Sequence, residues 1–161
     1  VWKKEGGPRG QLDKVARQDE YGVMRSYLDE IPKGRLLDAG CGLGDWVLFL
    51  EREGFEVMGL DISRKTVEQL RKRFPDKDFQ AGDIRDTRMA DNAFDACFSW
   101  GVFEHFENGL QDSFNEAYRV LKPGGGVTTA HRPWCWRVGG TSGCGPRRDA
   151  ALTDRRRDGY R

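Results

Sequence analysis

The segment Leu36–Gly44, which reads LLDAGCGLG, is the stretch of sequence from which the fold is predicted. Its first residues, together with Arg35, form a short apolar run ended by glycine, as is typical of a strand buried on both faces of a sheet. Glycines at alternate positions then allow the backbone to turn sharply and to approach a ligand without a side-chain clash. A helix is predicted from Asp45, so its free N–H groups would face that turn. By itself, the pattern fits an ordinary tight turn as well as a nucleotide-like ligand.

Strand and helix patterns alternate along the chain on both sides of this segment. Strands are predicted at 35–39, 55–62, 77–84 and 94–101, and helices at 12–31, 45–54, 63–74 and 113–121. Strands that alternate with helices over short connections form parallel sheets with right-handed crossovers. The predicted fold class is therefore α/β: a Rossmann-like, mostly parallel sheet with helices on both faces and with its C-terminal strands incomplete.

Three local signals refine the predicted helix boundaries. Gly22 is expected to divide the first helical region in two, because glycine is unfavourable inside a helix. Ser63 is a typical N-cap residue, and Pro75 ends the helix that follows it. Ser113 and Glu116 have the spacing of a capping box, which predicts the start of the last helix.

Acidic residues follow the second and third predicted strands, at the edge where parallel α/β sheets bind their ligands. Asp61 lies 21 residues after Gly40, the spacing at which a carboxylate accepts hydrogen bonds from both hydroxyls of a ribose. Asp83 has the chemistry to accept from an adenine amino group, between apolar faces supplied by Ile62 and Ile84. The alternative for Asp83 alone is the capping of a turn, which aspartate often does.

Five sequence motifs follow one another between residues 35 and 125. They read LLDAGCGLGDW, GLDIS, GDIRD, DNAFDACFSWGVFEHFEN and EAYRVLKPGG. Their order and spacing resemble those of the class I S-adenosylmethionine-dependent methyltransferases, specifically the broad bacterial family that methylates small molecules. No single motif is specific, but together they span just over half of the chain. The resemblance implies S-adenosylmethionine as the cofactor and a small molecule as the methyl acceptor.

The resemblance also implies ten cofactor-binding residues. The glycine loop would surround the methionine part of the cofactor, with Asp38 near its ammonium group. The acid after the second strand would hold the ribose hydroxyls, and the acid after the third strand, with the two isoleucines, would bind the adenine. The residues that end the fourth strand would offer backbone contacts to the methionine amino group. In chain order, the set is Asp38, Gly40, Cys41, Gly42, Asp61, Ile62, Asp83, Ile84, Ser99 and Trp100.

Methyl transfer from a sulfonium mainly needs an in-line approach and the exclusion of water, so positioning supplies much of the catalysis. A base is needed only if the acceptor arrives protonated. His105, with Glu104 beside it, is the candidate catalytic residue for that step, because histidine titrates near neutral pH. A structural hydrogen bond is the alternative role for His105. Phe103–Phe106 would lie towards the acceptor, whose reacting atom stays open among oxygen, nitrogen, carbon and sulfur.

Three regions of different composition are predicted. They are a frayed N-terminus at 1–11, an incomplete S-adenosylmethionine-binding methyltransferase domain at 12–131, and an irregular Arg/Gly-rich tail at 132–161. A short strand is predicted at 127–130, but the tail lacks the apolar residues that would order it. The net charge changes from −4 over residues 1–125 to +5 over the remainder. We interpret this change as a shifted reading frame or a premature end after about residue 126.

The composition also excludes several partners and sites. A net charge of +1 with mostly scattered arginines gives no argument for nucleic acid. No apolar run is long enough to cross a bilayer and no leader opens the sequence, so a cytoplasmic protein is expected. Cys41 and Cys97 are interpreted as small buried residues rather than as disulfide partners. No metal site is expected, because His131, Cys135 and Cys144 match no paired cysteine spacing.

Two other functions remain open from the sequence. A nicotinamide-dependent oxidoreductase would have the spacing G-x-G-x-x-G, which this loop lacks, and the pair Tyr118 and Lys122 has no partner serine. A truncated module that binds S-adenosylmethionine without transferring the methyl group is the second alternative, since missing final strands would leave an open sheet edge. The oligomeric state is not predicted.

Overall fold

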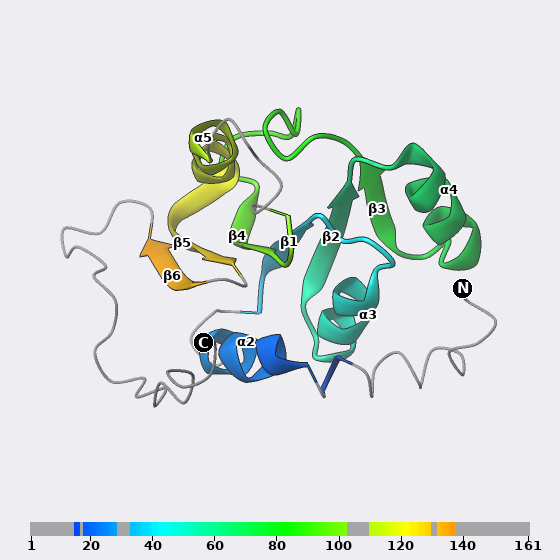
Figure 1. The fold of residues 1–161 in the computed structure, drawn as a ribbon, viewed down its shortest axis with the longest axis horizontal. Coiled ribbons are helices and arrows are strands. Elements are labelled where there is room, and N and C mark those ends of the chain that lie inside the picture. The colour runs from blue at the N-terminus through cyan, green and yellow to red at the C-terminus, as the bar shows by residue number, and fades with distance from the viewer. Residues whose placement is uncertain (1–14, 17, 29–32, 103–109, 130–131, 138–161) are drawn as a thin grey trace, which may run out of the picture.

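The fold is given by a computed structural model that describes residues 15–16, 18–28, 33–102, 110–129 and 132–137 (Figure 1). The helices are α2 (Asp19–Leu28), α3 (Asp45–Arg52), α4 (Arg64–Arg73) and α5 (Gln111–Val120). The strands are β1 (Arg35–Ala39), β2 (Glu56–Asp61), β3 (Asp78–Ala81), β4 (Phe94–Ser99), β5 (Leu121–Thr129) and β6 (Arg132–Arg137). The predicted frayed N-terminus, 1–11, and residues 138–161 of the predicted tail lie outside the described residues.

All six strands form one sheet in the order β3-β2-β1-β4-β5-β6. The first five are paired in parallel, and β6 runs antiparallel to β5. The strand order reverses between β1 and β4, so the loops after these two strands diverge at the carboxyl edge of the sheet. The α/β, Rossmann-like fold predicted from the sequence is confirmed.

Two hydrophobic clusters cover the two faces of the sheet. One contains Leu36 of β1 together with residues of α2, α3 and α4, and the other contains Leu37 of β1 together with residues of α5. Figure 1 accordingly shows α5 on one side of the sheet and α2 and α3 on the other. Because successive strand residues point to opposite faces, the apolar run of β1 is buried from both sides.

The glycine loop, residues 40–44, turns the chain out of β1 and into α3. The N–H groups of Gly40 and Cys41 both donate to the carbonyl oxygen of Leu60 in β2, at 2.7 and 2.8 Å. Gly44 has a φ of 78°, in the left-handed region that favours glycine. A Cβ atom at Gly44 would lie 2.9 Å from ring carbons of Phe79, so α3 begins in a space that only glycine fits.

One of the three predicted helix-boundary signals is confirmed, and two are wrong. Ser63 is the N-cap of α4, and its Oγ accepts a hydrogen bond from the Thr66 N–H at 3.3 Å. Gly22 lies inside α2 and does not divide it. Ser113 and Glu116 form no capping box, because α5 begins before Ser113 and the Glu116 carboxylate binds a different segment of the chain. Both side chains are buried, and for Glu116 a tertiary partner overrides the local pattern.

The C-terminal strands differ from the prediction. β5 begins at Leu121, directly after α5, rather than at Val127. Residues 132–137, which the sequence analysis assigned to the irregular tail, form β6 and pair with β5. Composition is a poor guide here because a sheet edge pairs through backbone N–H and C=O groups, which extended residues of almost any type carry.

We predict that Gly44→Ala destabilises the protein more than Gly54→Ala does. Both glycines have a positive φ, 78° and 92°, so each alanine costs about 1–2 kcal/mol in backbone strain. At Gly44 the added methyl group also meets the Phe79 ring, whereas nothing lies within 4 Å of a Cβ at Gly54. Urea unfolding should show an additional loss of about 1–3 kcal/mol for Gly44→Ala. Equal losses in the two variants would contradict the steric requirement at Gly44.

Candidate functional site

A cavity of about 270 Å³ opens at the carboxyl edge of the sheet, close to the point where the strand order reverses. Its lining comes from the ends of the strands and from the segments that follow them, as expected for a ligand site in an open α/β sheet. The lining residues are Gly40, Leu60, Asp61, Ile62, Gly82, Asp83, Ile84 and Val102. Five of the ten residues predicted to hold the cofactor therefore meet at one cavity.

The Asp61 carboxylate is anchored at this cavity by two backbone groups. Its Oδ2 accepts from the N–H of Gly42 at 2.9 Å, and its Oδ1 accepts from the N–H of Ser63 at 2.8 Å. Asp61 thereby joins the glycine loop to the start of α4. Because a carboxylate has about four lone-pair sites, each oxygen keeps capacity for a further donor such as a ligand hydroxyl.

Apolar side chains form the walls of the cavity. Ile84 is buried, whereas Ile62 is 72% exposed although it is a large apolar side chain. Val102 lies against the glycine loop so closely that a Cβ atom at Gly40 would clash with its Cγ2. Apolar walls with a few carboxylates at the edges suit a ligand that combines a flat apolar part with polar groups.

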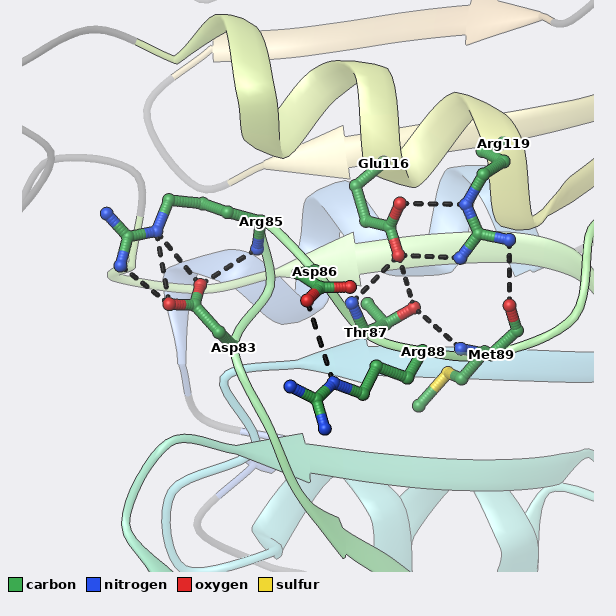
Figure 2. Close-up of polar contacts among 8 residues, drawn as sticks. All are labelled: Asp83, Arg85, Asp86, Thr87, Arg88, Met89, Glu116 and Arg119. Carbon is green, nitrogen blue, oxygen red and sulfur yellow. Dashed lines mark hydrogen bonds and ion pairs between the residues drawn. The ribbon is translucent and has the colours of Figure 1, made fainter.

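Asp83 is paired with an arginine that the sequence reasoning did not single out. Arg85 holds the Asp83 carboxylate from both sides, with Nε 3.0 Å from Oδ1 and Nη2 2.6 Å from Oδ2 (Figure 2). The Arg85 N–H also donates to Oδ1, at 2.9 Å, so Asp83 does cap a turn. These hydrogen bonds lower the pKa of Asp83, which keeps it ionised at neutral pH. The sequence signal for the pair is the spacing of the acid and the arginine in GDIRD.

Asp38, at the end of β1, is a buried acid with an unmet hydrogen-bonding capacity. It is 2% exposed, and its Oδ2 has no hydrogen-bond partner among the described residues. Burial, followed by the negative charges of Asp61 and Asp45, raises the pKa of Asp38 well above its usual range. A buried carboxylate in this state is costly, and such groups concentrate where a ligand supplies the missing partner. In the loop that follows β1, a Cβ atom at Gly42 would meet nothing within 4 Å, so there is open space at that position.

Three of the predicted residues turn their side chains away from the cavity lining. Cys41 is unpaired and buried in the cluster under α3, where burial raises the pKa of its thiol. The Ser99 hydroxyl donates to the carbonyl oxygen of Ala39 at 2.6 Å and so joins β4 to β1. The Trp100 ring packs against Trp46, with 5.4 Å between ring centroids. A ligand at the carboxyl edge would therefore meet these residues through their backbone groups.

A candidate base is also predicted from the sequence, whereas neither a metal site nor a membrane-spanning helix is expected. His105 and the rest of Phe103–Phe106 lie outside the described residues. Over the described ranges, no group of three or more histidine, cysteine or acidic side chains is arranged to hold a metal ion. Within the same ranges, no helix has both the length and the apolar character needed to cross a membrane.

Glu116 of α5 was predicted to form a capping box with Ser113, but it instead contacts the segment that follows β3. Its Oε1 accepts from the N–H and the hydroxyl of Thr87, at 2.8 and 2.6 Å (Figure 2). Its two oxygens also accept from Nη2 and Nε of Arg119, at 2.7 and 2.8 Å. Thr87 lies three residues after Ile84 in the same irregular segment, so this contact binds α5 to the chain close to the cavity wall. The i, i+3 spacing of Glu116 and Arg119 was a usable signal for the ion pair but not for Thr87.

Comparison with known proteins matches this region of the chain. The profile of a family described as "Methyltransferase domain" matches residues 36–125, more than half of the chain. A 37.1 kDa transposon protein of Streptomyces fradiae is 33% identical over 134 residues, covering 76% of this chain and 38% of that protein. The malonyl-[acyl-carrier protein] O-methyltransferase of Pectobacterium atrosepticum is 30% identical over 96 residues, covering 60% of this chain and 38% of that enzyme.

A solved structure shares the fold. The S-adenosylmethionine-dependent methyltransferase of Mesorhizobium loti superposes with a TM-score of 0.63 at 26% identity, covering 73% of this chain and 53% of that one. Against the curated relatives the overlap is shorter, since the chain spans between 35% and 51% of their length. The family match begins in β1 and includes the glycine loop, every residue that lines the cavity, and the Glu116 contact.

We predict opposite effects on stability for the two neighbouring acids at β1 and β2. Asp38→Asn should raise the Tm of the ligand-free protein, because it removes a buried negative charge that lacks a partner at Oδ2. Asp61→Asn should lower the Tm, because the amide has one acceptor oxygen where the carboxylate binds two N–H groups. A change of about 1 kcal/mol corresponds to about 2–4 °C, which scanning fluorimetry resolves. A lower Tm for Asp38→Asn would indicate that the Asp38 carboxylate stabilises the ligand-free protein, contrary to this prediction.

We predict that the stabilisation provided by ionised Glu116 is lost in acid. Its hydrogen bonds from Arg119 and then from Thr87 lower the pKa of Glu116 to about 2, against an ordinary value of 4.5. The stabilisation is therefore complete above about pH 4.5 and is lost as the pH falls towards 2. Between pH 6 and pH 3, the free energy of unfolding should fall by about 2 kcal/mol more in the wild type than in Glu116→Gln. Urea unfolding at both pH values measures this, and equal decreases would argue against an ionised Glu116.

Proposed function

Because the chain belongs to the methyltransferase domain family that uses S-adenosylmethionine, we propose that it binds this cofactor in the cavity at the carboxyl edge of the sheet and transfers its methyl group to a small molecule. The observation that carries the proposal is Asp38, a buried acid beside an open glycine loop with no partner for one of its oxygens among the described residues. The ammonium group of the methionine part is a cation of the kind that this carboxylate lacks. The family match also favours methyl transfer over the nicotinamide chemistry that the sequence left open.

Polar groups of the cavity fit the rest of the cofactor. Asp61, held by Gly42 and Ser63, has acceptor capacity left for the two ribose hydroxyls. Asp83, kept ionised by Arg85, would accept from the adenine amino group, beside the apolar wall of the cavity. The isoleucines that follow β2 and β3 would pack against the two faces of the ring.

Backbone groups complete the proposed cofactor site. Gly40, Cys41 and Gly42 would surround the methionine part without side-chain interference, since Cys41 points into the core. Ser99 and Trp100 would contribute backbone groups, because their side chains are used within the protein.

The chemistry needs little from the protein beyond placement. When bound, S-adenosylmethionine supplies a methyl group on a sulfonium, which is electrophilic without further activation. The residues around the cavity would orient it, and apolar side chains such as Val102 would keep water away from the reacting atoms. For an acceptor that arrives protonated, we keep His105 as the proposed base. The unpaired, buried thiols of Cys41 and Cys97 support a reducing, cytoplasmic location.

We predict saturable binding of S-adenosylhomocysteine to the wild-type chain and a loss of about 10–100-fold in affinity for Asp61→Ala. Removing the acceptor of two ribose hydroxyls costs about 1–3 kcal/mol, which gives this range. Asp78→Ala is the matched control, since Asp78 lies in β3 at the amino edge and pairs with Arg35. Isothermal titration calorimetry measures all three proteins. Absence of saturable binding by the wild type would overturn the proposed function.

Methyl transfer itself needs a second measurement. Labelled S-adenosylmethionine incubated with pools of small-molecule acceptors should give a labelled product that depends on the wild-type chain. Binding without transfer to any pool would identify the chain as a cofactor-binding module instead.

A further inference from the structure

The cavity wall that would face adenine is a segment without regular secondary structure. Residues 82–87 follow β3 and include Gly82, Asp83 and Ile84, all of which line the cavity. A segment of this kind has no ladder of backbone hydrogen bonds to hold it in place. Its position must therefore come from contacts with the rest of the protein.

Inside the segment, local contacts close a turn. The N–H of Asp86 donates to the carbonyl oxygen of Asp83 at 3.1 Å, and the two residues also form an isolated bridge. Arg85 binds the Asp83 carboxylate through its side chain and its backbone N–H (Figure 2). These bonds make Asp83–Asp86 one local unit, so a shift at its end is passed to Asp83.

Glu116, which is distant in the sequence, holds the residue that follows this unit. Thr87, the next residue after the turn, donates both its backbone N–H and its hydroxyl to the same oxygen of Glu116. Both residues are buried, and the contact joins positions 29 residues apart. The Thr87 hydroxyl in turn accepts from the N–H of Met89 at 3.2 Å. Glu116 therefore adds a polar anchor to a segment whose Ile84 already packs in the hydrophobic cluster under α5.

Glu116 is itself held in one orientation. Arg119 binds both oxygens of the carboxylate and extends to the carbonyl oxygen of Met89 at 2.7 Å and to the carboxylate of Asp91. A bidentate arginine pair of this kind is a directional contact that resists rotation of the carboxylate. Glu116 does not line the cavity, and its hydrogen bonds to Thr87 are its direct link to the segment that does.

We propose that Glu116 is a positioning residue of the cofactor site: through Thr87 it places Asp83 and Ile84 against the base, and so sets the preference for adenine over bases that lack its amino group. The inference rests on the proposed function and deepens it. A purely structural role for Glu116 would lower the amount of folded protein but would leave the relative affinities for two ligands unchanged. A positioning role changes that ratio.

The test compares S-adenosylhomocysteine with S-inosylhomocysteine, in which an oxygen replaces the adenine amino group. The wild type should prefer the adenosyl compound, because Asp83 accepts from an amino group and repels an oxygen. In Glu116→Gln, which keeps the size but loses the charge and the bidentate pair, the ratio of the two dissociation constants should fall by about 5-fold or more. Calorimetry with both ligands gives the ratio independently of the folded fraction.

Three further variants control for folding. Thr87→Val removes the hydroxyl at nearly constant shape and should also lower the ratio, whereas Thr87→Ser keeps the hydroxyl and should preserve it. Asp91→Asn alters another partner of Arg119 on the exposed side and should leave the ratio unchanged. If Glu116→Gln does not fold, the two Thr87 variants decide the question.

The possible outcomes separate the two claims. A wild type that prefers the adenosyl compound, with the same ratio in Glu116→Gln and in Thr87→Val, would overturn the positioning role and leave the proposed function intact. A wild type that binds neither compound would overturn the proposed function and this inference with it. A lower ratio in both variants, with the ratio kept in Thr87→Ser, supports the positioning role.

Discussion

The two hydrogen bonds that Gly40 and Cys41 donate to the Leu60 carbonyl oxygen determine the geometry of the whole carboxyl edge. They continue the pairing of β1 with β2 beyond the last residue of β1 and bring the loop over the end of β2. The next N–H along, that of Gly42, then reaches the carboxylate of Asp61, the residue after Leu60. Because Asp61 also binds the start of α4, the loop, the acid and the helix form one unit. A Cβ atom at Gly40 would clash with Val102 and one at Gly44 with Phe79, and both residues have a positive φ, which is the physical reason for these two glycines.

Three carboxylates near this edge differ in whether both of their oxygens have hydrogen-bond partners. Asp61 and Glu116 each accept hydrogen bonds at both carboxylate oxygens, so neither oxygen lacks a partner when no ligand is bound. Asp38 is buried with an oxygen that has no partner among the described residues, and nearby acids make its charge still less favourable. Of the three, Asp38 is the carboxylate to which a bound cation would supply a missing partner. This contrast gives Asp38 a different physical status from that of its neighbours.

Features that depend on neighbouring residues could be predicted from the sequence. The limits of β1, the glycine loop and the Ser63 cap follow from local patterns, and the structure has them where the patterns place them. Contacts between distant segments could not be predicted, since nothing near Glu116 indicates that its partner is Thr87. β6 was missed for a related reason: edge pairing uses backbone groups that leave little trace in composition. The roles of the ten predicted cofactor residues stay predictions, although five of them share the cavity.

The motif EAYRVLKPGG, which contributed to the family resemblance, supplies no residue that lines the cavity. Its physical role is to brace the sheet at two edges. At the amino edge, Lys122 binds both oxygens of Asp95 at 2.9 Å, and Asp95 also accepts from the N–H of Arg35, where β1 begins. Towards the carboxyl edge, Glu116 binds Thr87 and so holds the segment beside the cavity. One helix–strand unit thus positions both the strand that leads into the glycine loop and the wall opposite it. A motif can therefore be characteristic of a methyltransferase family without lining the cavity, because the segments that line it take their positions from such braces.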